Sequence, residues 1–181
     1  MEATSNLILI GPMGAGKTTQ GKWLARHLGM EFVDLDVCIE QATGTDIVNI
    51  FETEGEAGFR KRESEALNAV LCRDNLVLST GGGTVLEEAN RALLKQRGTV
   101  VYLHLPPEMQ LQRLAGDRKR PLLQTPDRAE RLQQLSEIRT PIYQHCADIT
   151  LDLSRIPMSQ VRHRILDAIT EYRAEAQTRH A

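Results

Sequence analysis

The segment GPMGAGKT, residues 11–18, constrains the fold more than any other part of the sequence. It matches the pattern GxxxxGK[ST], with Gly11, Gly16, Lys17 and Thr18 at the required places. The apolar run NLILI precedes it and the amphipathic run KTTQGKWLARHLG follows it, as in a buried strand that leads into a helix. Glycines let successive backbone N–H groups point at phosphate oxygens, and a helix N-terminus adds about half a positive charge. The motif therefore predicts a loop that binds the phosphates of a nucleotide.

Apolar runs alternate with longer amphipathic stretches along the rest of the chain. The strand candidates are NLILIG, EFVDLD, NLVLST, VVYLHL and DITLDL, with helical patterns between them. This rhythm predicts a three-layer α/β/α fold with a central five-stranded parallel sheet, whose ligands bind beyond the carboxyl ends of the strands. Val161, Ile165, Ile169 and Tyr172 have helical spacing and predict a helix packed on the core. A length of 181 residues suits a single domain, residues 1–181.

Composition excludes several classes of protein. The net charge of −2 and the mixing of acidic and basic residues do not favour nucleic acid as a partner. Three cysteines without a CxxC pair indicate neither a disulfide framework nor a zinc site and fit a reducing cytoplasm. No signal sequence opens the chain, and no apolar run approaches the roughly 20 residues of a membrane span. We expect a cytoplasmic protein with no membrane partner.

Motifs that are missing narrow the kind of nucleotide-binding protein. The sequence contains no DxxG and no NKxD, so a GTPase would lack its usual residues. The predicted strand 76–79 ends without the acidic pair of an ATPase motor. Phosphoryl transfer to a small molecule is the class that remains. In it, Lys17 would reach the β- and γ-phosphates and the Thr18 hydroxyl would ligate Mg²⁺.

Two acidic residues and one basic residue that follow the second predicted strand are candidates for holding a phosphoryl acceptor. Asp34 and Asp36 are two apart, so both side chains share one face if the chain stays extended. One would accept from water on Mg²⁺ and the other from an acceptor hydroxyl; alternatively, Asp36 only caps the next helix. In FRKRE, Arg60 and Glu63 would be neighbours on a helix, and Arg60 could grip a carboxylate. The alternative is a solvated charged face.

Three later segments offer further candidates. The glycines Gly81–Gly83 follow the third predicted strand and permit close approach of a small polar ligand, unless they form only a floppy turn. Residues 115–126, AGDRKRPLLQTP, predict an exposed, mobile lid with basic residues at 118–120 that neutralise transition-state charge, or else a basic loop without a catalytic role. Arg139 lies in RTPIY, where Thr140 and Pro141 are expected to end a helix. It would either satisfy the last carbonyls or form a second clamp on the same carboxylate.

Taken in order, GPMGAGKT, DLD, FRKRE, GGG, RPLL and RTPIY resemble the shikimate kinase family over about Asn6 to Asp152. The resemblance implies a P-loop, nucleoside-monophosphate-kinase-like fold and transfer of the γ-phosphoryl of ATP to the 3-hydroxyl of shikimate, in aromatic amino-acid biosynthesis. It implies ATP and shikimate as small-molecule substrates and one Mg²⁺ per subunit. It also implies a lid at about 115–126 and a shikimate-binding region at about 34–63. We expect a monomer.

The same resemblance implies roles for particular residues. The ATP-phosphate segment would comprise Gly14, Ala15, Gly16, Lys17, Thr18 and Thr19. Thr18 would ligate Mg²⁺ directly, with Asp34 in its outer shell, and Arg120 would face the phosphates from the lid. The shikimate contacts would be Asp36, Arg60, Gly81, Gly82, Gly83 and Arg139. Lys17, Asp36 and Arg120 would be catalytic, with Asp36 either an orienting acceptor or a general base. Arg155, in the segment LSRIP, would contact adenine.

Two other functions are compatible with parts of the pattern. A related kinase for gluconate or a nucleoside monophosphate would share the phosphate loop, but it would not need paired arginines together with GGG and RPLL. A nucleotide-dependent regulatory module would use GPMGAGKT to sense ATP and the basic segment to dock a protein. In that case the candidate acceptor residues would have gathered by coincidence.

Overall fold

The central strand β1 (Leu7–Ile10) divides its side chains between two hydrophobic cores. In the computed structural model, which describes residues 6–117 and 121–179, all four of these side chains are fully buried. Leu7 and Leu9 pack into one core, whereas Ile8 and Ile10 pack into the other. Successive side chains of a strand point to opposite faces, so β1 is covered on both sides.

Five parallel strands form one sheet in the order β2-β3-β1-β4-β5, as predicted. The other four strands are β2 (Glu31–Asp34), β3 (Leu76–Ser79), β4 (Thr99–His104) and β5 (Ile149–Asp152). Ile8 of β1 lies in register with Leu78 of β3 and Val100 of β4. The connections move from β1 to one edge of the sheet and later cross to the other edge. The carboxyl end of β1 therefore lies where open α/β sheets bind their ligands.

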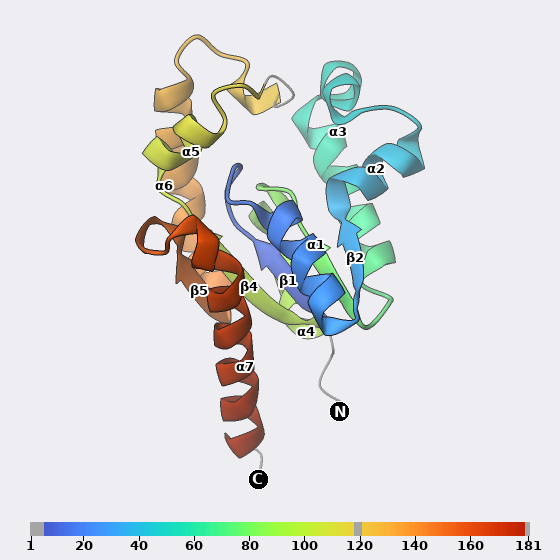
Figure 1. Cartoon of the computed structure of the whole chain (residues 1–181). Coiled ribbons are helices and arrows are strands. Elements are labelled where there is room, and N and C mark those ends of the chain that lie inside the picture. The colour runs from blue at the N-terminus through green and yellow to red at the C-terminus, as the bar shows by residue number, and fades with distance from the viewer. Residues whose placement is uncertain (1–5, 118–120, 180–181) are drawn as a thin grey trace.

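Helices cover both faces of the sheet (Figure 1). One face carries α1 (Lys17–Leu28) and α7 (Val161–Arg179), and Val161, Ile165 and Ile169 are buried there, which confirms the predicted core-packing helix. The other core takes side chains from α2 (Leu35–Thr43), α3 (Ile47–Val70), α4 (Glu88–Arg97) and α6 (Arg128–Cys146). None of the helices in residues 6–117 and 121–179 is both long and apolar enough to cross a membrane.

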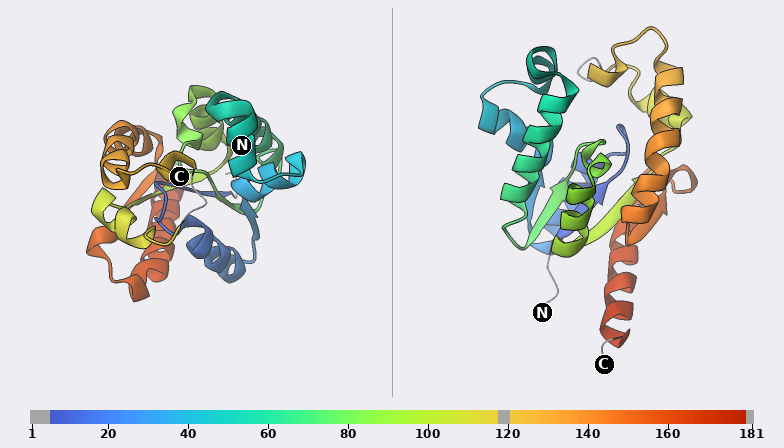
Figure 2. Two further views of the ribbon diagram at one scale, coloured as in Figure 1. Left: turned by 90° about the horizontal axis from the view of Figure 1, so that it is seen from above. Right: turned by 180° about the vertical axis from the view of Figure 1, so that it is seen from behind.

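Two helical arms rise beyond the carboxyl ends of the strands (Figures 1 and 2). One arm is α2 with the start of α3; the other is α5 (Pro107–Arg113), the short 3-10 turn Pro121–Leu123 and the start of α6. A small apolar cluster ties the second arm together: Leu114, Leu123, Leu132 and Leu135. Leu123 is therefore buried, and the expectation that the whole of 115–126 is exposed was wrong at this residue.

Helix α6 runs through Pro141, contrary to the prediction that Thr140 and Pro141 end it. Proline has no N–H to donate, so the helix loses one hydrogen bond at this position. The side chains of Leu135, Arg139 and Tyr143 are nevertheless buried in succession along one face of α6. We infer that tertiary burial outweighs the loss of one hydrogen bond, a contribution that a local rule about proline does not include.

Candidate functional site

The loop between β1 and α1 has the curled backbone that phosphate binding needs. Gly14 and Gly16 have φ of 79° and 85°, in the left-handed region that favours glycine, and Gly16 directly precedes α1. A cavity of about 230 Å³ opens here, lined in part by Gly14, Gly16, Lys17, Thr18 and Thr19. The side chain of Ala15, by contrast, packs into the hydrophobic core. The loop thus presents a helix N-terminus to a cavity, an arrangement that favours binding of anions.

Lys17 is folded against the phosphate loop. Its Nζ donates hydrogen bonds to the carbonyl oxygens of Gly11, at 2.8 Å, and Pro12, at 2.9 Å. The side chain is only 9% exposed. The ammonium group is therefore a positive charge held at the rim of the cavity by the loop itself.

Two side-chain oxygen atoms that are joined by a hydrogen bond lie beside the phosphate loop. The Thr18 hydroxyl donates to Oδ2 of Asp34 at 2.7 Å and lies 3.3 Å from the Ser79 hydroxyl. Both Thr18 and Asp34 line the phosphate-loop cavity. Hydroxyl and carboxylate oxygens are the donors that Mg²⁺ takes from proteins when substrate phosphates and water complete its shell.

Asp34, rather than Asp36, caps the helix that follows β2. The chain becomes helical at Leu35, and Oδ1 of Asp34 accepts from the backbone N–H of Asp36 at 3.1 Å. The extended arrangement predicted for these two residues, and the alternative that Asp36 is the cap, were both wrong. An aspartate in extended conformation just before a helix satisfies its free N–H groups, which sets the start of α2 one residue after the strand. Asp36 instead lies in the first turn of α2 and lines the cavity.

A second cavity, of about 380 Å³, adjoins the first. Its lining includes all the residues predicted to hold the acceptor: Asp36, Arg60, Gly81, Gly82, Gly83 and Arg139. Met13, Asp36, Gly81 and Gly82 line both cavities. A phosphate donor in the first cavity would therefore be next to an acceptor in the second.

Arg60 is part of a buried network and not of a solvated charged face, so that alternative was wrong. Its Nη1 lies 2.7 Å from Oε2 of Glu63, and its Nη2 lies 3.1 Å from Oε1 of Glu56. The Glu63 side chain is fully buried, and its Oε1 accepts from the Thr84 hydroxyl at 2.6 Å. Burial opposes the charge on Arg60, but Glu63 and Glu56 raise its pKa above the ordinary value. Glu63 thus holds a cation at the wall of the second cavity.

The glycine turn after β3 is closely packed, which contradicts the alternative of a floppy turn. A Cβ atom on Gly83 would lie 2.3 Å from Nη2 of Arg60, and one on Gly81 would lie 2.7 Å from Oε1 of Glu63. Only glycine allows these polar side chains to lie directly on the turn. The Tyr143 hydroxyl donates to the carbonyl of Gly82 and secures the turn from the side of α6.

Arg139 is a buried guanidinium group on the wall of the second cavity. The residue is 5% exposed. Burial lowers the pKa of Arg139, and Arg60 lowers it further, while the neighbouring Tyr143 opposes this shift. In the part of the chain that the structure describes, no carboxylate forms an ion pair with Arg139. A buried cation of this kind fits an anionic group on a ligand.

The Thr84 hydroxyl gives a direct test of the buried network. Thr84→Val keeps the side-chain shape but removes the donor to Glu63, so we expect the free energy of unfolding to fall by about 2 kcal/mol. Urea denaturation monitored by circular dichroism measures it. Thr150→Val, on the exposed side of β5, is the control and is expected to stay within about 0.5 kcal/mol. Equal stability of Thr84→Val and the wild type would show that this hydrogen bond contributes nothing.

Two groups of predicted site residues are not brought to either cavity by the described structure. Arg118, Lys119 and Arg120 lie outside the described residues. Arg155 is 85% exposed in its side chain and pairs with Asp152 at 3.2 Å, and neither cavity has it in its lining, so its contact with adenine stays a prediction.

Sequence reasoning missed three residues of the site. Arg113 of α5 lines the phosphate-loop cavity, and its Nη1 donates to the Gly14 carbonyl at 3.1 Å. No local pattern marks it, because its partner is 99 residues away. Tyr143 could have been found from its spacing, since it follows Arg139 by one helical turn. Phe51 was missed although it lines the second cavity and its ring centroid lies 4.7 Å from that of Phe59.

Shikimate kinases are found in each comparison with known proteins. The family model described as shikimate kinase matches residues 13–170. The chain is 55% identical to a shikimate kinase of Stenotrophomonas maltophilia over 152 residues, 84% of each chain, and 46% identical to one of Xanthomonas campestris pv. campestris over 166 residues, 92% of each. Among solved structures, it is similar to the shikimate kinase from Acinetobacter baumannii in complex with shikimate. That match has 48% identity and a TM-score of 0.89, and it covers 94% of this chain and 95% of the other.

Proposed function

The chain belongs to the shikimate kinase family, and from this premise we propose that it transfers the γ-phosphoryl group of ATP to the 3-hydroxyl of shikimate. The products would be shikimate 3-phosphate and ADP, in the pathway to chorismate and the aromatic amino acids. The observation that carries the proposal is a pair of arginines, the partly buried Arg60 and the buried Arg139, in a cavity that adjoins the phosphate loop. A relative with 48% identity is described in complex with shikimate, which supports the same acceptor.

The acceptor cavity matches the chemistry of shikimate. Shikimate carries one carboxylate and three hydroxyl groups. Arg60 and Arg139 would bind the carboxylate. Asp36 and the Gly82 backbone, which line the same cavity, would orient the hydroxyls. Asp36 lines both cavities, so its carboxylate is suited to accept from the hydroxyl that attacks. It would act mainly by orientation, because a loose phosphoryl-transfer transition state needs little base catalysis.

The donor side would use the phosphate loop. The N–H groups of residues 14–19 would hold the ATP phosphates, and Lys17 would place its charge on the γ-phosphoryl group. Thr18 and Asp34 fit one Mg²⁺ ion per subunit, Thr18 as a direct ligand and Asp34 in the outer shell, 2.7 Å from the Thr18 hydroxyl. When bound, this ion would neutralise charge on the β- and γ-phosphates.

We further propose that residues 115–126 act as a lid, from which Arg120 would face the phosphates. Pro121 and Leu122 line the acceptor cavity, which supports a position of this segment beside the acceptor. Closing it would exclude water that otherwise takes the phosphoryl group. The proposal also includes a single domain over residues 1–181, a monomeric enzyme and a cytoplasmic location.

One assay separates this function from its alternatives. ADP release from ATP and Mg²⁺ is measured with shikimate, gluconate, AMP or no acceptor. We expect stimulation by shikimate alone. Stimulation by gluconate or AMP instead would assign the related kinase activity, and acceptor-independent behaviour in all four reactions would favour the regulatory module.

A further inference from the structure

Helix α3 is bent into two segments at Gly55. Its backbone there has φ 70° and ψ −177°, which no residue of a regular helix adopts. Residues 47–54 form the first segment and residues 56–70 the second. Only glycine adopts this conformation readily, so the bend is built into the sequence.

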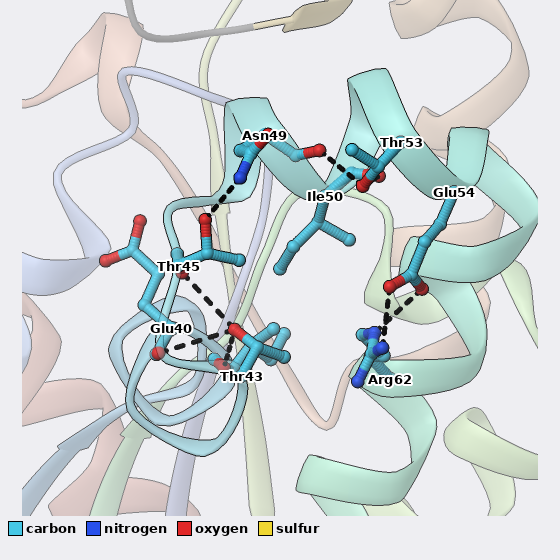
Figure 3. Close-up of polar contacts among 9 residues, drawn as sticks. Glu40, Thr43, Thr45, Asn49, Ile50, Thr53, Glu54 and Arg62 are labelled. Carbon is cyan, nitrogen blue, oxygen red and sulfur yellow. Dashed lines mark hydrogen bonds and ion pairs between the residues drawn. The ribbon is translucent and has the colours of Figure 1, made fainter.

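A bidentate ion pair between Arg62 and Glu54 joins the segments across this bend. Nε of Arg62 donates to Oε2 of Glu54 at 2.8 Å, and Nη2 donates to Oε1 at 2.6 Å (Figure 3). A guanidinium fork on a carboxylate fixes direction as well as distance. The pair also raises the pKa of Arg62 and lowers that of Glu54 through their hydrogen bonds.

The sequence leaves room for this pair at Gly58. A Cβ atom on Gly58 would lie 2.5 Å from Cβ of Glu54. Any other residue would push Glu54 away from the second segment and so away from Arg62. The absence of a side chain at Gly58 therefore permits the close approach of Glu54 to the second segment, and this observation is independent of the ion pair.

The other end of the first segment is tied to α2 (Figure 3). The Asp46 side chain caps the segment by accepting from the N–H of Asn49 at 2.8 Å. Nδ2 of Asn49 donates to the Thr45 hydroxyl, and the Thr43 hydroxyl donates to the Thr45 carbonyl at 3.2 Å. This end of the first segment is therefore held by α2, its middle is anchored by Ile50, which is buried in the core, and the ion pair acts on the opposite end.

Both segments line the acceptor cavity. Ile47, Val48 and Phe51 come from the first segment, and Phe59, Arg60 and Glu63 come from the second. The ring centroids of Phe51 and Phe59 are 4.7 Å apart, and the Arg60 guanidinium lies 5.2 Å from the Phe59 ring centroid. A change of angle at Gly55 would therefore move the Phe51 wall relative to Arg60.

We propose that the Glu54–Arg62 pair is a latch that sets the angle between the two segments of α3 and so positions Phe51 and Arg60 for the acceptor. The inference rests on the proposed function for the identity of that acceptor. Glu54 and Arg62 line neither cavity, so they are positioning residues that act through others.

The test compares Glu54→Gln and Arg62→Gln with Glu52→Gln and Lys61→Gln, which remove neighbouring exposed charges of the same two segments. We expect each latch variant to raise the KM for shikimate by about two- to fivefold, the range for loss of a surface ion pair. The KM for ATP and kcat should change by less than about twofold, and both controls should behave like the wild type. An unchanged KM for shikimate in the latch variants, or an equal rise in the controls, overturns the latch.

Two further measurements distinguish a latch from a general loss of structure. In Glu54→Gln/Arg62→Gln the KM for shikimate should rise no more than in either single variant, and additive effects would contradict coupling. Hydrogen exchange of ligand-free protein should show faster exchange over residues 47–54 in Arg62→Gln than in the wild type, and equal exchange overturns the latch. The exchange result does not depend on the acceptor. Absence of shikimate-dependent ADP release by the wild type would instead overturn the proposed function.

Discussion

Lys17→Met is expected to lower kcat by about 10³-fold while the protein stays folded. Methionine has nearly the length of lysine but carries no charge, so the γ-phosphoryl group would lose the cation that stabilises it in the transition state. The residue is only 9% exposed, and a thioether is well tolerated at a site of this kind. Steady-state kinetics at saturating ATP and shikimate measure kcat, and circular dichroism with a melting curve measures the fold.

Lys22→Met is the matched control for this variant. Lys22 lies in the same helix α1, but it is exposed, its Nζ lies 5.8 Å from the centroid of the Phe32 ring, and it does not line the phosphate-loop cavity. The same chemical change there should leave kcat within about twofold of the wild type. A Lys17→Met enzyme with a near-normal kcat would remove Lys17 from the catalytic role.

The parts of the molecule that could be predicted from sequence are those with local signals. The phosphate loop, residues 11–18, is recognised from sequence because its glycines, Lys17 and Thr18 lie close together in the chain and follow a short apolar strand. The five strands are recognised for the same reason. Arg60 and Glu63 are neighbours on one helical turn, so their ion pair at 2.7 Å was also accessible to spacing arguments.

The parts that could not be predicted depend on contacts between distant segments. Arg113 reaches the phosphate loop from 99 residues away, and nothing in its surroundings in the sequence marks it. Pro141 predicts a helix end by a local rule, but α6 continues past it because burial of Arg139 and Tyr143 stabilises the helix on both sides of the proline. The capping of α2 by Asp34 instead of Asp36 depends on where β2 ends, and element boundaries are the least certain part of a sequence pattern.

These differences alter how the acceptor site is understood. From the sequence, Arg60, Gly83 and Arg139 are separate candidates on three segments. In the structure Arg60 and Gly83 belong to one network, because Glu63 holds Arg60 and the Thr84 hydroxyl, and Gly83 leaves room for the guanidinium group. Arg139 lies on the wall of the same cavity. Removing a single member should therefore affect both acceptor binding and the stability of the fold, and a test of Arg60 must separate the two.

Arg60→Ala is expected to weaken shikimate binding by about 10²-fold or more, with ATP binding changed by less than about threefold. The variant loses one clamp on the carboxylate, and it also leaves the fully buried Glu63 without its cation, which would cost about 3–5 kcal/mol of stability. Isothermal titration with each substrate measures the two affinities, and urea denaturation measures the stability.

Two companion variants separate the role in binding from the role in stability. Arg60→Lys keeps a positive charge near Glu63 but loses the fork that grips a carboxylate, so it should recover stability more than it recovers shikimate affinity. Lys61→Ala removes an exposed cation from the next position and should leave both affinities unchanged within about twofold. If Arg60→Ala and Arg60→Lys weaken ATP and shikimate binding to the same degree, Arg60 is a structural arginine and the carboxylate clamp must be assigned to Arg139 alone. A loss confined to shikimate, persisting in the stable Arg60→Lys protein, places the acceptor carboxylate on this guanidinium group.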